Sequence, residues 1–247
     1  MLLKTLVSIV SVSLLFLNSS IVCNVTENIF INDNSSGKIE IISQRDEYRY
    51  MQFLKEDYAK EEGFIEEIIT IKELIHFYKD TFSRFSKAEQ TCLKKHEQIE
   101  IYNKENSIDK EYIYKLSQNF NSVNEIVDLK NGYKYINCLK DNRPMNLDKE
   151  EKEIKYSFDG IVFNRSFKVL NNIEFIKYRE MYNEKSFLLD FNKGLTYTLN
   201  YHFPRKIKSV SNVNAIIGAD QKSLKLIFLL TDCLQNPEIT NLEVVLE

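Results

Sequence analysis

The sequence has 247 residues, with 33 lysines and arginines against 36 aspartates and glutamates, and a formal net charge of −3. This balance gives no electrostatic case for nucleic acid as a partner, because such binding needs a strongly basic surface. The three prolines and six glycines are scattered, and no Gly-, Ser- or Pro-rich tract divides the chain. Beyond a leader, the sequence therefore predicts one domain.

The first 22 residues have the pattern of an export signal. Lys4 precedes an apolar segment, small residues occupy 19–20, and Cys23 follows. The apolar segment has the length typical of a signal peptide, which is shorter than a membrane-spanning helix needs. We therefore expect a signal peptide at 1–22, and an exported domain at 23–247.

Cys23 can be processed in two ways. If a bacterial lipoprotein peptidase cuts before it, the thiol takes a diacylglyceryl group and acyl chains hold the protein at a membrane. The polar residues that follow Cys23 fit this reading, whereas Val22 stands where a lipobox has Gly, Ala or Ser. We expect lipidation at Cys23 and a location in the bacterial cell envelope, with simple secretion as the alternative.

The other cysteines are Cys92, Cys138 and Cys233. If Cys23 is lipidated, these three allow at most one disulfide, and if the protein is simply secreted, four cysteines allow two. No CxxC pair occurs, so the sequence indicates neither a zinc site nor a redox site. The simplest interpretation of each cysteine is a small buried apolar residue.

The first predicted elements are a hairpin and a helix. Strands rich in β-branched residues at 28–32 and 38–42 flank the turn Asp33-Asn34-Ser35-Ser36-Gly37, whose residues tolerate tight or left-handed geometry. Apolar residues then recur at helical spacing over 45–60, and Gly63 is placed to end that helix.

A short strand and two helices come next. The run 68–71 is wholly β-branched, which favours a strand, and a helix follows over 73–85. Ser86 and Glu89 have the spacing of a capping box, which predicts a second helix through Lys95.

The middle of the chain predicts another hairpin and another helix. Apolar residues alternate with polar ones over 98–103 and 111–119, as in strands with one buried face. The run Ser122-Val123-Asn124-Glu125 again matches a capping box, and predicts a helix through Leu129 that can extend toward Cys138.

The charged tract 142–152 reads as a solvated loop. Beyond it the sequence predicts strands at 154–163 and 166–170, with Asp159-Gly160 as a turn or bulge. A helix is expected over 173–187.

The last part of the chain predicts strands. Residues 195–201 alternate apolar and polar, which indicates one buried face, and Pro204 ends that strand. A hairpin at 215–217 and 224–230, and a terminal strand at 242–246, complete the chain. Together these elements predict a single α+β domain, a largely antiparallel sheet of about eight to ten strands with helices packed on one face.

Several segments resemble lipoproteins of unknown function from Flavobacteriia and other Bacteroidota. The first reads Val25-Thr26-Glu27-Asn28-Ile29-Phe30-Ile31-Asn32-Asp33 after the acceptor cysteine, and ends in Ser36-Gly37. The others are 203–212, Asp220-Gln221-Lys222 and 234–247, so the resemblance spans most of the mature chain. It implies a lipid-anchored envelope protein and implies no particular activity or site.

No catalytic, cofactor-binding or metal-binding residue is assigned. His76, His96 and His202 are far apart and match no HxxxH or HExxH spacing. No GxSxG motif occurs, and Cys92 with His96, four residues apart on one helical face, lacks a group to orient the histidine.

Carboxylate pairs and glycine motifs give no site either. Glu66-Glu67 and Glu150-Glu151 are adjacent in sequence, so the side chains of each pair point apart on a strand. No glycine pattern for binding a phosphate is present. We expect no cofactor.

Two further features bear on binding. Four tyrosines of predicted strands could line one face of the sheet, where an apolar ligand could lie: Tyr112, Tyr114, Tyr197 and Tyr201. A packed interface between sheet and helices is the alternative. Arg205, Lys206 and Lys208 form a compact basic cluster, read as a solvated strand end, with a contact to anionic lipid headgroups as the alternative.

We therefore expect an exported envelope protein, joined to a membrane by a lipid anchor, that binds a protein partner or an apolar ligand without catalysis. The alternatives are an enzyme whose site has no recognisable motif and a purely structural envelope component.

Overall fold

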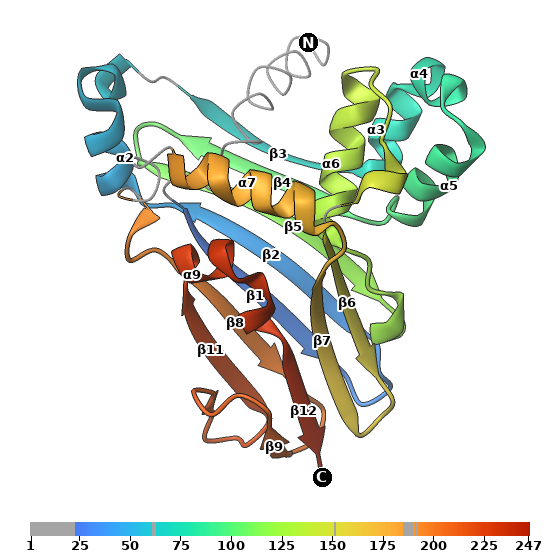
Figure 1. The fold of residues 1–247 in the computed structure, drawn as a ribbon, viewed down its shortest axis with the longest axis vertical. Helices are drawn as coiled ribbons and strands as arrows, with labels where there is room; N and C mark the ends of the chain where they lie inside the picture. The colour runs from blue at the N-terminus through green and yellow to red at the C-terminus, as the bar shows by residue number, and fades with distance from the viewer. Residues whose placement is uncertain (1–22, 61–62, 151, 185–189, 191) are drawn as a thin grey trace.

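The computed structural model describes residues 23–247 except 61–62, 151, 185–189 and 191. The predicted signal peptide at 1–22 lies outside the described residues. The described residues form both α-helices and strands. The predicted mixture of helices with a large, mainly antiparallel sheet is thus confirmed (Figure 1).

Eight strands form the larger sheet, in the order β10-β11-β8-β1-β2-β5-β4-β3. Their bounds are β1 Cys23–Ile31, β2 Gly37–Arg45, β3 Phe64–Thr70, β4 Glu100–Asn106, β5 Glu111–Phe120, β8 Thr196–His202, β10 Ile216–Ile217 and β11 Ser223–Leu229. Neighbours are antiparallel except for β1 and β8, which run parallel and bring segments about 170 residues apart side by side.

A second sheet has the order β6-β7-β12-β9 and is antiparallel throughout. Its strands are β6 Lys152–Phe158, β7 Val162–Val169, β9 Ile207–Val210 and β12 Leu242–Leu246. The sequence predicts three of these strands but not that they form a sheet of their own, and β9 is not predicted at all.

The α-helices are α2 Glu47–Leu54, α3 Ile71–Phe77, α4 Lys79–Arg84, α5 Lys87–Lys95, α6 Leu129–Lys140, α7 Asn172–Glu184 and α9 Leu230–Gln235. Short 3-10 helices occur at η1 Lys55–Lys60, η2 Val123–Glu125, η3 Leu147–Lys149 and η4 Pro237–Thr240. The unpredicted α9 and η4 link the last strand of the larger sheet to β12.

The two faces of the larger sheet have different surroundings. The odd-numbered residues of β1, including Val25, Glu27 and Ile29, are buried, while the even-numbered residues face outward. On the buried face, Tyr114 packs against Tyr133 of α6, and Tyr201 against Phe163 of β7. This inner face is therefore covered partly by helices and partly by the second sheet.

Most local predictions are confirmed. The hairpins at 28–42 and 98–119 form, with strands longer than predicted for the first pair. The capping box of α5 is present, because Ser86 accepts from the Glu89 amide and the Glu89 carboxylate accepts from the Ser86 amide. The alternation at 195–201 corresponds to β8, whose odd-numbered residues are buried.

The predicted helix over 122–129 is wrong. Only η2 forms there, and the chain then runs extended at Ile126. The Gln118 side chain explains this, because it donates to the Glu125 carbonyl (3.2 Å) and accepts from the Val127 amide (3.1 Å), replacing helical bonds. The helix begins at Leu129 instead, where the Asp128 side chain caps it.

Several boundaries also differ; for example, the helix predicted over 45–60 becomes α2 and the 3-10 helix η1. Ile71 begins α3 rather than ending a strand, because Thr70 and Glu73 form a capping box. The helix predicted over 73–85 is divided at Tyr78 into α3 and α4. Residues 185–187 of the predicted helix 173–187 lie outside the described residues, and the rest corresponds to α7.

Candidate functional site

A buried ion pair joins the two sheets. Glu27 occupies an inward position of β1, and Arg165 faces it from β7. The guanidinium Nε and Nη2 atoms lie 2.9 Å from Oε1 and Oε2 of the carboxylate, respectively. Exposure is 0% for Glu27 and 2% for Arg165, so the pair is removed from water, and its neighbours must satisfy its remaining polar atoms.

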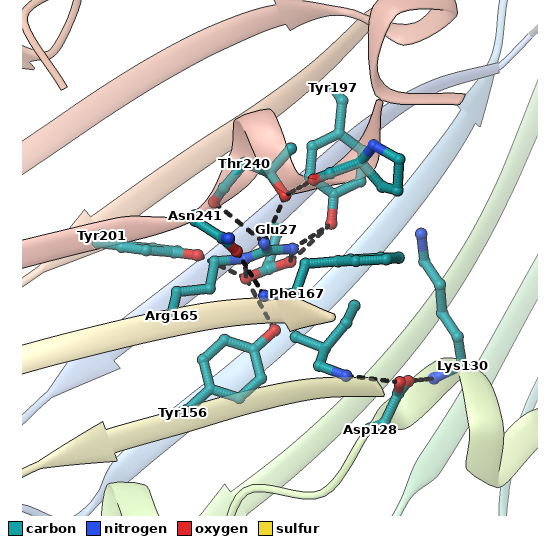
Figure 2. Close-up of polar contacts among 12 residues, drawn as sticks. Glu27, Asp128, Lys130, Tyr156, Arg165, Phe167, Tyr197, Tyr201, Thr240 and Asn241 are labelled. Atoms are coloured by element: carbon teal, nitrogen blue, oxygen red, sulfur yellow. Dashed lines mark hydrogen bonds and ion pairs between the residues drawn. The ribbon is translucent and has the colours of Figure 1, made fainter. Parts of the chain in front are cut away.

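Those neighbours come from three elements, β6, β8 and η4 (Figure 2). The hydroxyls of Tyr197 and Tyr201 on β8, and of Tyr156 on β6, donate to the Glu27 carboxylate at 2.6, 2.5 and 2.9 Å. Thr240, at the end of η4, accepts from Arg165 Nη1 through its carbonyl (3.1 Å) and its hydroxyl (2.7 Å). The Tyr197 hydroxyl also accepts from Nη2 at 3.3 Å.

Every guanidinium N–H and both carboxylate oxygens are thus engaged. Burial alone would raise the pKa of Glu27, but the Arg165 charge and the hydrogen bonds from Arg165, Tyr197 and Tyr201 together lower it to about 2. The carboxylate stays ionised at neutral pH. With no free donor or acceptor left for a substrate, the chemistry of this cluster is that of a structural connection between the sheets.

Lys130 lies beside this cluster, at the second residue of α6. Its ammonium nitrogen is 5.1 Å from the centre of the Tyr197 ring, and the side chain keeps solvent-exposed surface.

A surface pocket of about 440 Å³ lies where β1 and β8 end. Its lining is Phe30, Ile31, Asn32, Asp33, Asn34, Ser36, His202, Phe203, Pro204 and Lys222. Ile31 and Phe203 are almost fully buried, while Phe30 is 51% exposed. The rings of Phe30 and His202 stack, with centroids 4.7 Å apart and planes 4° from parallel.

The polar groups of this pocket differ in how they are engaged. Asn34 accepts from the amide and the hydroxyl of Ser36, and the Lys222 ammonium donates to the Pro204 carbonyl at 2.7 Å. The Asp33 carboxylate has no hydrogen bond or ion pair with any described residue. His202 Nδ1 lies 3.8 Å from a carboxylate oxygen of Asp220.

The ion pair and the pocket share two strands. Phe30 and His202 are cross-strand partners in the parallel pair β1·β8. Glu27 lies three residues before Phe30, and Tyr201 directly before His202, on the inner face. The Tyr201–Glu27 hydrogen bond thus joins the same two strands whose register places the two rings together.

The three histidines are not brought together. His76 is exposed on α3, and His202 lies at the pocket. His96 is buried, and burial lowers its pKa; its Nδ1 lies 2.8 Å from the carbonyl oxygen of Cys92, not from the thiol. Within the described ranges, no three His, Cys, Asp or Glu side chains are grouped as a metal site would need.

All four cysteines lie within the described residues, and none of them forms a disulfide there. Cys23, Cys138 and Cys233 are buried and Cys92 is half-buried. Burial raises the pKa of each thiol, to about 12 for Cys23 and about 11 for Cys233.

The other predicted groups have separate positions. The four tyrosines do share the inner face, where Tyr197 and Tyr201 belong to the Glu27 cluster. Glu66 and Glu67 point to opposite faces of β3, whereas Glu151 lies outside the described residues. Arg205, Lys206 and Lys208 are exposed, and Arg205 donates to the Glu247 carbonyl at 2.6 Å.

Sequence reasoning missed Glu27 and Arg165. A signal was available, because Glu27 stands at an inward position between Val25 and Ile29, and Arg165 stands between Phe163 and Phe167. A charge at an inward position of a strand predicts a buried partner. Nothing in the local pattern identifies which residue that partner is.

No protein-family model matches the sequence, and no curated protein is similar to it. Among solved structures, the chain is similar to the folded domain of the LppM protein of Mycobacterium tuberculosis, determined by NMR. The identity is 9% and the TM-score 0.37, with 92% of this chain and 90% of that chain covered. A similarity this low assigns neither fold nor function.

The expected relation to lipoproteins of Flavobacteriia and other Bacteroidota gains no support from sequence comparison and stays a prediction. None of the described helices combines the length and apolar character that crossing a membrane requires.

Proposed function

We propose that this is an exported envelope protein, anchored by a lipid on Cys23, that binds a protein partner at the pocket where β1 and β8 end, without catalysing a reaction. The observation that carries the binding role is the pocket itself, in which the exposed Phe30 ring stacks on the half-buried His202 ring beside an unengaged carboxylate. The anchor is supported by the leader sequence and by the position of Cys23 directly after it.

The chemistry of the pocket favours a basic side chain of the partner. An arginine can stack its planar guanidinium on an aromatic ring and at the same time pair with a carboxylate. Phe30 with His202 supplies the rings, and Asp33 supplies the carboxylate.

An apolar ligand fits this pocket less well, because Asn32, Asp33, Asn34 and Ser36 supply much of its lining. The pocket also lies at strand ends rather than between the sheet and the helices, where an apolar ligand was expected.

Binding can be tested with a defined probe. We expect N-acetyl-arginine amide to shift the NMR signals of Phe30, Asp33 and His202, while the uncharged citrulline analogue shifts them much less. Asp33→Asn should abolish the difference between the two probes, and Asp148→Asn, an exposed carboxylate elsewhere, should preserve it. Equal responses to the two probes would refute a site for a basic side chain.

The anchor is tested separately. Intact mass of the membrane fraction from the native host should show a chain that starts at Cys23 and carries acyl groups. Cys23 is 3% exposed at the start of β1, opposite Arg45, so acylation requires this strand end to open. We expect Cys23→Ala to release the protein from membranes, and an unmodified terminus at another residue would refute the anchor.

A further inference from the structure

Three polar side chains lie side by side on the inner face of the larger sheet. Asn103 of β4 is the cross-strand partner of Glu67 on β3 and of Tyr114 on β5. The next inward positions of β4 and β5, Ile101 and Leu116, are apolar and buried. The polar row therefore interrupts a face that is otherwise built for a hydrophobic core.

Helix α6 carries a matching row. Tyr133, Asn137 and Lys140 are spaced by four and three residues, so they share one face of the helix. The Tyr133 ring meets the Tyr114 ring with centroids 5.3 Å apart. At the other end, burial raises the pKa of Glu67 and lowers that of Lys140, while each charge favours the ionised form of the other.

These end contacts place Asn137 over Asn103 in the middle. Asn103 is 7% exposed and Asn137 is 6% exposed. The Oδ1 atom of each is buried and accepts no hydrogen bond from any described residue. Asn137 also lowers the pKa of Tyr133, as an amide N–H directed at the tyrosine oxygen does.

We infer that an ordered water molecule lies between α6 and β4, donating one hydrogen to Asn103 Oδ1 and the other to Asn137 Oδ1. Buried carbonyl oxygens without a donor are rare and costly, and internal waters occupy polar sites of this kind. Water offers the two donors that the two acceptors need. Because α3, α4 and α5 all contact α6, this water helps to hold the whole helical layer on the sheet.

The first test is a high-resolution crystal structure of the protein. It should show a density peak within about 2.7–3.2 Å of both Oδ1 atoms. A direct amide contact between Asn103 and Asn137, with no peak, would overturn the inference. A peak surrounded by four or more oxygens at shorter distances would identify a cation instead, and would also overturn it.

The second test uses leucine, which is close to asparagine in shape. Asn103→Leu and Asn137→Leu should each lower the folding equilibrium constant by roughly ten- to hundredfold. Each variant leaves one buried acceptor and removes one of the two hydrogen bonds that hold the water. The double variant removes both acceptors and should lose no more than the weaker single variant. Asn119→Leu, at an exposed position of β5, is the control. Fully additive losses would contradict a shared water.

Discussion

Arg165 donates a hydrogen bond to each carboxylate oxygen of Glu27 and so joins the two sheets, with both N···O distances at 2.9 Å. Three tyrosine hydroxyls donate further hydrogen bonds to the carboxylate, and Thr240 accepts from the guanidinium. A buried pair of this kind is worth little over an apolar replacement, but removing one partner leaves a charge stranded in the core. The cluster therefore specifies how the two sheets align, more than it adds to stability.

Replacing Arg165 alone should cost more stability than replacing both members of the ion pair. We expect Arg165→Met to lower the free energy of unfolding by about 3–5 kcal/mol, measured in urea at pH 7, because Glu27 keeps its charge without a counterion. The exposed Arg143, which pairs with Asp141 at 3.0 Å, is the control, and Arg143→Met should change stability by less than about 0.5 kcal/mol. The double variant Glu27→Leu/Arg165→Met should be more stable than Arg165→Met alone. A double variant that is less stable would contradict this account.

The same cluster predicts a dependence on acid. The pKa of Glu27 is about 2, below its ordinary value of 4.5, so its ionised form contributes stability that is complete above pH 4.5 and is lost as the pH falls toward 2. By pH 3 the loss should reach about 2 kcal/mol. Glu27→Gln cannot titrate at this position, so the stability difference between the protein and this variant should shrink by that amount between pH 6 and pH 3. An unchanged difference would mean that Glu27 does not have a lowered pKa.

The two faces of the sheet can be compared directly. Leu199 of β8 is 0% exposed, whereas Ile227 of the neighbouring β11 is 50% exposed on the opposite face. We expect Leu199→Ala to cost about 2–5 kcal/mol of unfolding free energy, and Ile227→Ala less than about 0.5 kcal/mol. Chemical denaturation of both variants checks this, and similar losses would contradict the assigned faces.

Local structure was predictable because the spacing of apolar, polar and capping residues along the sequence indicates it. The alternation around Leu199 and Tyr201 indicates a strand with one buried face, and the structure has it. The spacing of Ser86 and Glu89 correctly starts α5. Where a distant side chain intervenes, as Gln118 does at Val127, the local pattern predicts the wrong element.

Strand partners and the candidate site were not predictable, because they depend on contacts between distant segments. No spacing indicates that β8 lies parallel to β1, and so none places His202 against Phe30. The inward charge of Glu27 predicts a partner but does not select Arg165. The separate four-stranded sheet, which supplies that partner, is likewise absent from any local pattern.

The turn between β10 and β11 contains a left-handed residue that is not glycine. Gln221 has a φ of 56°, and its carbonyl accepts from the Ile207 amide at 2.7 Å. Gln221→Gly removes the clash of Cβ with the backbone at some cost in chain entropy, so we expect a change between zero and about 1 kcal/mol in favour of folding. Gln221→Val should lose at least about 1 kcal/mol, because a β-branched residue fits this conformation poorly. Thermal unfolding of both variants tests this prediction, and equal stabilities of Gln221→Gly and Gln221→Val would contradict strain at this position.

The rates at which the thiols react with a reagent test for thiol-dependent catalysis. Burial raises the pKa of Cys138 and Cys233, and both side chains are largely covered, so they should react slowly with a thiol reagent at pH 7 until the protein is denatured. Cys92 is half-buried and also has a raised pKa, so it should react first among the described cysteines, yet more slowly than a small free thiol. Mass spectrometry after timed labelling gives the order, and Cys92→Ser should remove the early product alone. A cysteine modified within seconds in the folded protein would instead indicate a thiol with a lowered pKa, and would favour an enzyme over a binding protein.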